Sequence, residues 1–158
     1  MTPILSFTAE EVWKYLPQEP GKTDSVHLTS FPEAKSEYLD DALNERWERI
    51  WEIRAMVTKV LEEARKEKVI GLSLDAQVHL FLPEKVFPFF ECYENDLKSI
   101  FIVSSVTLHL AKDEKEVRAE VSPAEGKKCE RCWNYDVTVG AHKEHETICR
   151  RCVEAIQG

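Results

Sequence analysis

The sequence predicts an α+β fold in which helices come first, a small mixed α/β layer follows, and a four-cysteine zinc finger ends the chain. Three observations predict it. Apolar residues recur every three or four positions in residues 36–66, apolar and polar residues alternate in residues 74–82, and four of the five cysteines lie after residue 128. We therefore expect three parts, formed by residues 1–70, 71–122 and 126–158.

The composition excludes several classes of protein. The chain has 158 residues, of which 43% are hydrophobic and 32% are charged, with a net charge of -8. This apolar fraction is too high for a disordered chain, and no apolar stretch approaches the roughly 20 residues that cross a bilayer. Residues 1–4 contain no basic region before an apolar run, so we expect no secretory signal, and the odd cysteine count argues against a secreted disulfide framework. We expect a cytoplasmic monomer with no membrane partner.

The first helix is predicted by a capping box. Thr8 is the expected N-cap, Glu11 follows three residues later, and the helix continues through Trp13 until Pro17 ends it. Residues 17–32 are rich in turn-forming residues, so we expect a loop with a short extended piece at residues 26–28.

A long helix is predicted over residues 36–66, because it lacks Pro and Gly and Gly71 lies just beyond it. We expect Trp47 and Trp51, like Trp13, to pack in the interior. One face carries cations that form a weaker candidate for RNA contact: Arg46, Arg49, Arg54, Lys59 and Arg65. The favoured interpretation is a solvated face on which these cations pair with glutamates: Glu45, Glu48, Glu52, Glu62 and Glu63.

The middle of the chain predicts the order β-α-β-β-β. Residues 74–82 alternate as a half-buried strand, and residues 84–97 have helical spacing with Pro88 in the first turn. Three further short apolar runs predict strands, at residues 100–103, 106–110 and 116–121. We expect Cys92 to be a buried structural thiol, and residues 122–126 to form a linker.

The tail contains a C-x2-C-x16-C-x2-C pattern formed by Cys129, Cys132, Cys149 and Cys152. Two C-x-x-C turns can direct four thiolates at one ion, and four thiolates leave no open position for water on Zn²⁺. We therefore predict one structural zinc ion. The tail has too few large apolar residues for a core of its own, so the metal would supply folding energy.

The tail has alternative interpretations, which its residues disfavour or leave open. A thioredoxin-like redox pair needs a βαβ setting that the sequence lacks, and His142 and His145 are expected to be exposed loop residues rather than ligands. Trp133, directly after the second cysteine, is open to two interpretations: it covers the metal site, or it stacks on an unpaired base beside Arg131.

The net charge of the chain also changes near residue 126, where the cysteine-rich tail begins. Residues 1–125 carry a net charge of -9 and residues 126–158 a net charge of +1. A polyanion would then meet the tail, although ordinary surface variation explains the charge difference equally well. The sequence has no glycine-rich phosphate loop, no G-x-S-x-G and no nucleophile–base pair, so nothing in it activates a substrate.

Several segments resemble the anticodon-binding helices of class I tRNA synthetases for branched-chain amino acids: residues 3–13, 26–28, 51–65 and 70–76. The tail, with CERCWN at 129–134 and ICRRCV at 148–153, is similar to the C-terminal zinc finger of bacterial isoleucyl-tRNA synthetases. This resemblance implies a C-terminal fragment that begins inside the helical anticodon-binding bundle. The ATP-binding HIGH and KMSKS motifs and the editing domain of the family have no counterpart here.

The resemblance also implies a division of labour. The family enzymes activate isoleucine with ATP, transfer it to tRNA and hydrolyse mischarged valine. This chain is then expected to perform none of these reactions and to hold the anticodon stem-loop of tRNA(Ile), with the remainder of the synthetase as its other partner. The expected RNA-binding residues are Lys127, Lys128, Arg131, Trp133, Arg150 and Arg151.

Two alternative functions remain open at this point. One is a DNA-binding zinc finger of a base-excision glycosylase, which the acidic charge of residues 1–125 disfavours on a duplex. The other is a protein-interaction zinc ribbon with no role in nucleic-acid binding.

Overall fold

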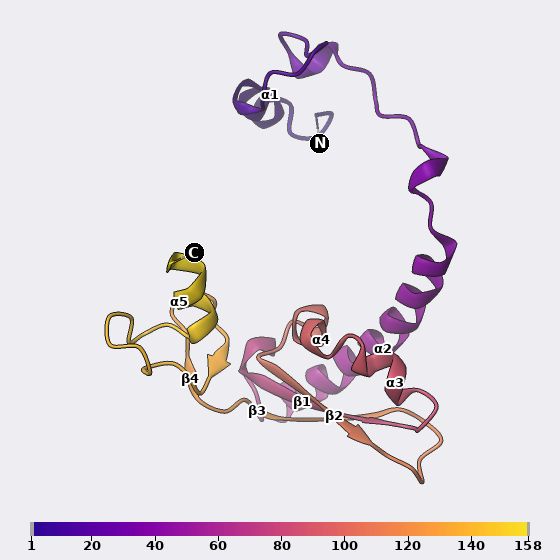
Figure 1. Ribbon diagram of the computed structural model, residues 1–158, viewed down its shortest axis with the longest axis vertical. Helices are drawn as coiled ribbons and strands as arrows, with labels where there is room; N and C mark the ends of the chain where they lie inside the picture. The colour runs from indigo at the N-terminus through magenta and orange to yellow at the C-terminus, as the bar shows by residue number, and fades with distance from the viewer. Residues whose placement is uncertain (1, 158) are drawn as a thin grey trace. The chain divides into compact units, whose positions relative to one another are not determined.

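The computed structural model describes residues 2–157, and the chain divides between Asp40 and Asp41 into two units (Figure 1). The first unit contains helix α1 (Ser6–Tyr15) and two short 3₁₀ turns, η1 (Val26–Leu28) and η2 (Ser36–Tyr38). The second unit contains helix α2, a three-stranded sheet and the cysteine-rich tail. None of the described helices is both long and apolar enough to cross a membrane.

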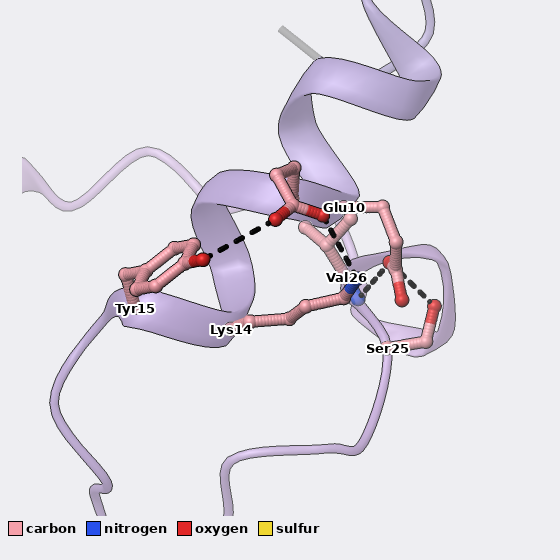
Figure 2. A network of polar contacts seen from close by, with 6 residues as sticks. Glu10, Lys14, Tyr15, Ser25 and Val26 are labelled. Atoms are coloured by element: carbon pink, nitrogen blue, oxygen red, sulfur yellow. Dashed lines mark hydrogen bonds and ion pairs between the residues drawn. The ribbon is translucent and has the colours of Figure 1, made fainter.

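Polar contacts hold the first unit together. The Glu10 carboxylate accepts hydrogen bonds from Ser25 Oγ at 2.8 Å and from the Val26 amide at 3.1 Å, as Figure 2 shows. The indole of Trp13 donates to the Thr23 carbonyl at 2.8 Å. These bonds join α1 to the loop after it, so the loop returns to the helix although the unit buries little apolar surface.

Two expectations for the first unit are wrong. The helix begins at Ser6 with Leu5 as N-cap, and no side chain caps it, so Thr8 lies inside the first turn rather than at the cap. The expected capping box fails because Glu11 bonds forward to Lys14 at 2.8 Å instead of back to the helix start. Residues 26–28 form the η1 turn rather than an extended piece, with Ser25 accepting from the His27 amide.

Helix α2 (Asp41–Lys66) is the long helix that the apolar spacing predicts, although it begins five residues later than expected. Ile50, Val57, Leu61 and Ala64 are buried, which is the three-and-four spacing of a helix with one apolar face. The chain leaves the helix at Lys68, which has a φ of 61°. A hydrogen bond of 2.9 Å from the Val69 amide to the Ala64 carbonyl closes the last turn.

The sheet has the order β2-β1-β3 and comprises β1 (Ala76–Leu82), β2 (Ser105–Leu110) and β3 (Arg118–Pro123). A 3₁₀ turn, η3 (Ser73–Asp75), precedes β1. Strand β1 is parallel to β2, with Val78 opposite Val106, and antiparallel to β3, with Val78 opposite Val121. The parallel pair requires a crossover connection, which α3 (Phe87–Glu91) and α4 (Glu94–Phe101) provide.

The core lies between one face of the sheet and the helices. Alternate residues of β1 are buried: Ala76, Val78, Leu80 and Leu82. They pack with buried residues of α2, α3 and α4, among them Ile50, Val57, Phe90 and Leu97. The alternation that predicts this strand is therefore confirmed by its burial pattern.

The crossover differs from the prediction. The single helix expected over residues 84–97 is two short helices that meet at Cys92 and Tyr93, and Cys92 is exposed rather than buried. The strand expected at residues 100–103 is wrong. Phe101 ends α4, Ile102 takes a φ of 58° in the left-handed region, and Val103 is buried in the turn before β2.

The tail forms a second, smaller cluster. Strands β4 (Lys127–Lys128) and β5 (Tyr135–Asp136) pair antiparallel, and helix α5 (Arg150–Gln157) ends the chain. Strand β3 extends through Pro123, so the expected linker at residues 122–126 is shorter than predicted. Three cysteines are buried with Val139, Ile148 and Val153. The assignment of functional parts at residues 1–70, 71–122 and 126–158 stays a prediction.

Candidate metal centre and nucleic-acid interface

Two tight turns present the four cysteines. In the first turn, the Trp133 amide donates to the Cys129 carbonyl at 2.8 Å and the Cys129 amide donates to the Asn134 carbonyl at 2.9 Å. The second turn opens α5, where the Val153 amide donates to the Cys149 carbonyl at 3.1 Å. A hydrogen bond of 3.1 Å from the Glu130 amide to the Thr147 carbonyl ties the two turns together.

The sulfur atoms surround one point. All four Sγ atoms lie within 4.8 Å of one another, and two of the distances, Cys129 to Cys152 and Cys132 to Cys149, are 3.7 Å. With Zn–S bonds of about 2.3 Å, a tetrahedral site places its sulfurs about 3.8 Å apart. The cluster therefore fits one zinc ion. It is the one group of potential metal ligands found among residues 2–157.

The surroundings of the sulfurs favour a bound cation. Burial raises the pKa of the Cys129 thiol, but hydrogen bonds from the backbone at Cys132, Cys149 and Arg131 outweigh it and lower that pKa to about 6. Burial, together with the neighbouring cysteine side chains, raises the pKa of Cys149 to about 12. Four sulfurs this close cannot all ionise without a positive ion between them, so the ion replaces protons that the cluster otherwise retains.

The histidines of the tail lie outside this cluster. His142 and His145 are half-buried rather than exposed, and their rings stack with centroids 5.3 Å apart. The Nδ1 atom of His142 is buried and has no hydrogen-bond partner among the described residues. The four cysteines therefore form the ligand set without a histidine.

The six residues expected to contact RNA fall into two groups. Lys127 and Lys128 form β4, which leads directly into the first cysteine turn with Arg131 and Trp133, and all four are exposed. Arg150 and Arg151 begin α5 on the second turn. Arg150 Nε donates to Glu154 at 2.9 Å, while a hydrogen bond to Cys132 raises the pKa of Arg151.

Trp133 has the most unusual conformation in the site. Its φ is 65°, a region that favours glycine, and its side chain is 62% exposed. The chain therefore holds a large aromatic ring in solvent next to a rigid metal turn. This arrangement suits stacking on an unpaired base.

Residues 1–80 match the family model described as the anticodon-binding domain of tRNA ligase. The chain belongs to this anticodon-binding family. Residues 126–155 match a second model, described as a zinc finger found in FPG and IleRS. The two matches lie at opposite ends of the chain.

Three relatives of the chain share one name, isoleucine–tRNA ligase. The chain is 42% identical to an isoleucine–tRNA ligase of Moorella thermoacetica, 45% identical to one of Geobacter sulfurreducens and 44% identical to one of Syntrophotalea carbinolica. Each match covers 99% of this chain and 18% of the relative. The chain therefore spans less than a fifth of the length of these relatives.

The sequence favours a solvated face on which the cations of α2 pair with glutamates, and the structure differs from this for two of the arginines. Arg65 pairs with Glu62 as expected. Arg54, however, donates to the Ile100 carbonyl at 2.9 Å and lies over the Trp51 ring, and Arg49 lies over the Phe89 ring. These two arginines pack α2 against the crossover helices. Trp51 is itself exposed rather than interior.

Two features were missed by the sequence analysis. Ser104 is buried and bonds to both the sheet region and the tail, and a serine in an apolar stretch gives no signal of this. His79 and His109 meet on the open face of the sheet, with Nδ1 and Nε2 3.0 Å apart. Alternation places both histidines on that face, but the parallel pairing of β1 with β2 cannot be read from either strand alone.

Proposed function

We propose that this chain is the anticodon-binding C-terminal part of an isoleucine–tRNA ligase, and that its zinc finger holds the anticodon stem-loop of tRNA(Ile). The family match, the relatives and the four-cysteine cluster support this assignment. The whole enzyme would join isoleucine to tRNA using ATP. This chain, acting as a monomeric part, contributes binding rather than chemistry.

One observation carries the proposal: Trp133 is exposed in a strained backbone conformation between metal ligands and cations. An anticodon loop offers unstacked bases for an aromatic plane and phosphates for Lys and Arg. The finger supplies the plane through Trp133 and cations through Lys127, Lys128 and Arg131. The finger carries these groups apart from residues 1–125, which have a net charge of -9.

The three expected parts receive separate roles in this proposal. Residues 1–70 contribute anticodon-binding helices, residues 71–122 form the α/β layer that carries the finger, and residues 126–158 contact the loop. The zinc ion would keep the two cysteine turns in place and would not touch the RNA.

The test is a fluorescence titration of the zinc-loaded chain with the anticodon stem-loop of an isoleucine tRNA, at two salt concentrations. A non-cognate stem-loop and an abasic DNA duplex serve as competitors. We expect the cognate loop to bind best, with an affinity that falls as salt rises by a log–log slope of about 0.7 per neutralised single-strand phosphate. Preferential binding of the abasic duplex would favour a glycosylase-like finger. If neither stem-loop nor the duplex binds at either salt concentration, a protein-interaction ribbon is favoured.

A further inference from the structure

One buried serine joins the sheet to the zinc finger. Ser104 lies in the turn between α4 and β2 and is 8% exposed, the one buried polar residue among residues 2–157. A hydroxyl in such a place costs free energy unless it is hydrogen-bonded. The partners of this hydroxyl therefore show what holds the turn in place.

The Ser104 hydroxyl bonds in two directions. It donates to the carbonyl of Leu74, in the η3 turn before β1, and accepts a hydrogen bond of 2.7 Å from the amide of Tyr135 in β5. Its own amide donates to the Ala76 carbonyl at 3.1 Å. The residue is thus fixed to the sheet on one side and holds the finger on the other.

Tyr135 is close to the residues expected to meet RNA. It lies two positions after Trp133 and pairs with Lys128 in the small β4–β5 ribbon. The carbonyl of its neighbour Asn134 accepts from Cys129 within the first cysteine turn. Holding the Tyr135 amide therefore holds the turn that presents Trp133.

The hydrogen bond between Tyr135 and Ser104 lies beside an open cleft, which makes it important for the orientation of the zinc finger. A cleft of about 610 Å³ lies here, with Ser105 of β2 and Glu94 of α4 on one side and Asp136 and Val137 of the finger on the other. Beside it, the connecting segment contributes a hydrogen bond of 2.7 Å from the Ala124 amide to the Asp75 carbonyl. Next to an open cleft, the bond from the Tyr135 amide to the Ser104 hydroxyl helps to set the angle between the two parts.

We propose that Ser104 is a positioning residue whose hydroxyl sets the orientation of the zinc finger relative to the sheet, so that Trp133 and Arg131 are pre-oriented for RNA. This inference rests on the proposed function for its RNA component. Pre-orientation raises affinity because less conformational freedom is lost on binding. A net hydrogen bond of about 1 kcal/mol corresponds to about a fivefold change in affinity.

The experiment compares the zinc-loaded chain with its Ser104→Ala variant. Amide hydrogen exchange at Tyr135 and residual dipolar couplings of the sheet and finger report the orientation, and a stem-loop titration reports RNA affinity. We expect faster exchange at Tyr135, couplings that no longer fit one alignment, and RNA binding about fivefold weaker. Zinc content should be unchanged. Ser105→Ala is the matched control, since the Ser105 hydroxyl makes no hydrogen bond within residues 2–157.

A double-mutant cycle separates positioning from general destabilisation. If Ser104 acts by placing Trp133 and Arg131, Ser104→Ala should cost less RNA affinity in the Trp133→Ala background, where only Arg131 is left to be placed, than in the wild-type background. An equal loss in both backgrounds would overturn the proposal. So would exchange and couplings that Ser104→Ala leaves unchanged.

Amide exchange and residual dipolar couplings of the wild-type chain also test the proposal, whether or not the Ser104→Ala variant folds. A protected Tyr135 amide and one common alignment for sheet and finger support the proposal, whereas a fast-exchanging amide or two independent alignments overturn it. If the wild-type chain binds no stem-loop, the proposed function fails, and the exchange and coupling data still decide whether Ser104 orients the finger.

Discussion

At the scale of single residues, Trp133 presents a conflict between stability and function. A non-glycine residue in the left-handed region costs on the order of 1 kcal/mol. Its φ is 65°, and at 62% exposure its ring gains little from packing. A residue chosen only for folding at this turn would be glycine. The exposed indole therefore fits the proposed contact with RNA better than a role in folding the finger.

Trp133→Gly should change stability and affinity in opposite directions. Relief of the backbone strain should stabilise the zinc-loaded finger by roughly 1 kcal/mol, while loss of the stacking plane should weaken stem-loop binding by about 1–3 kcal/mol. Thermal unfolding and RNA titration measure the two effects. Trp133→Ala is the control, since it loses the plane and keeps the strain. A destabilised Trp133→Gly that retains its RNA affinity would show that the indole covers the metal site instead.

The two groups of cations should differ in their effect on RNA binding. All four cations are exposed, but Arg150 is paired with Glu154 and Arg151 with Cys132, whereas the side chains of Lys128 and Arg131 have no partner within residues 2–157. Arg131→Ala and Lys128→Ala should each lower the salt slope by about one counterion, and Arg150→Ala by less. Binding measured across a salt series decides this. Equal slopes for Arg131→Ala and Arg150→Ala would contradict it.

At the scale of elements, the lack of a side chain at Gly126 allows the chain to pass close to β5 as it enters β4. Its φ is 93°, and a Cβ there would lie 2.4 Å from the Asp136 carbonyl carbon and 2.5 Å from its oxygen. Contacts this short cannot form, so a side chain at residue 126 requires β5 to move.

Gly126→Ala should therefore destabilise the finger by more than about 1 kcal/mol. Gly140→Ala is a matched control, because Gly140 has a φ of 94° and its nearest contact would be 3.8 Å away. The two variants share the backbone strain and differ in the close approach, so Gly126→Ala should lower the melting temperature further. Equal shifts would mean that the approach of β5 is unimportant.

The elements also show how far the sequence could predict this fold. Strand β1 is predicted well because only one of its faces meets the core, so alternation carries the information. The run at residues 100–103 is misassigned because it is apolar throughout, and an apolar run fits a buried helix end as well as a strand. The break at Cys92 and the bond from Ser104 to Tyr135 depend on tertiary packing, which no local pattern records.

The candidate metal site was more predictable than the fold. Four cysteines in two C-x-x-C turns specify a tetrahedral cluster through local geometry, and the sulfurs do meet around one point. The side-chain partners of Arg150 and Arg151 were less predictable, because they depend on where α5 begins. The RNA contacts themselves stay a prediction.

At the scale of the whole molecule, two separate clusters hold the second unit together. One contains the apolar residues of α2, the crossover helices and the sheet, and the other contains the cysteines with Val139, Ile148 and Val153. A cluster whose members are largely metal ligands has little apolar surface of its own to bury. The first cluster should therefore be stable without zinc, and the second should not.

Removal of zinc should unfold the finger and leave the sheet intact. Structural zinc contributes roughly 10–16 kcal/mol in small fingers, more than the few apolar residues of this cluster can replace. Chelation, or Cys132→Ser, should collapse the amide resonances of residues 126–157 while those of β1 and α2 keep their positions. Cys92→Ser is the control, because Cys92 is exposed and lies outside the cluster. Lowering the pH should release zinc in the same way, since protons compete with the ion for the thiolates and occupy more of them as the pH falls. Loss of the β1 resonances together with those of the finger would show that the two clusters fold as one, because a sheet that is stable on its own cannot depend on the ion.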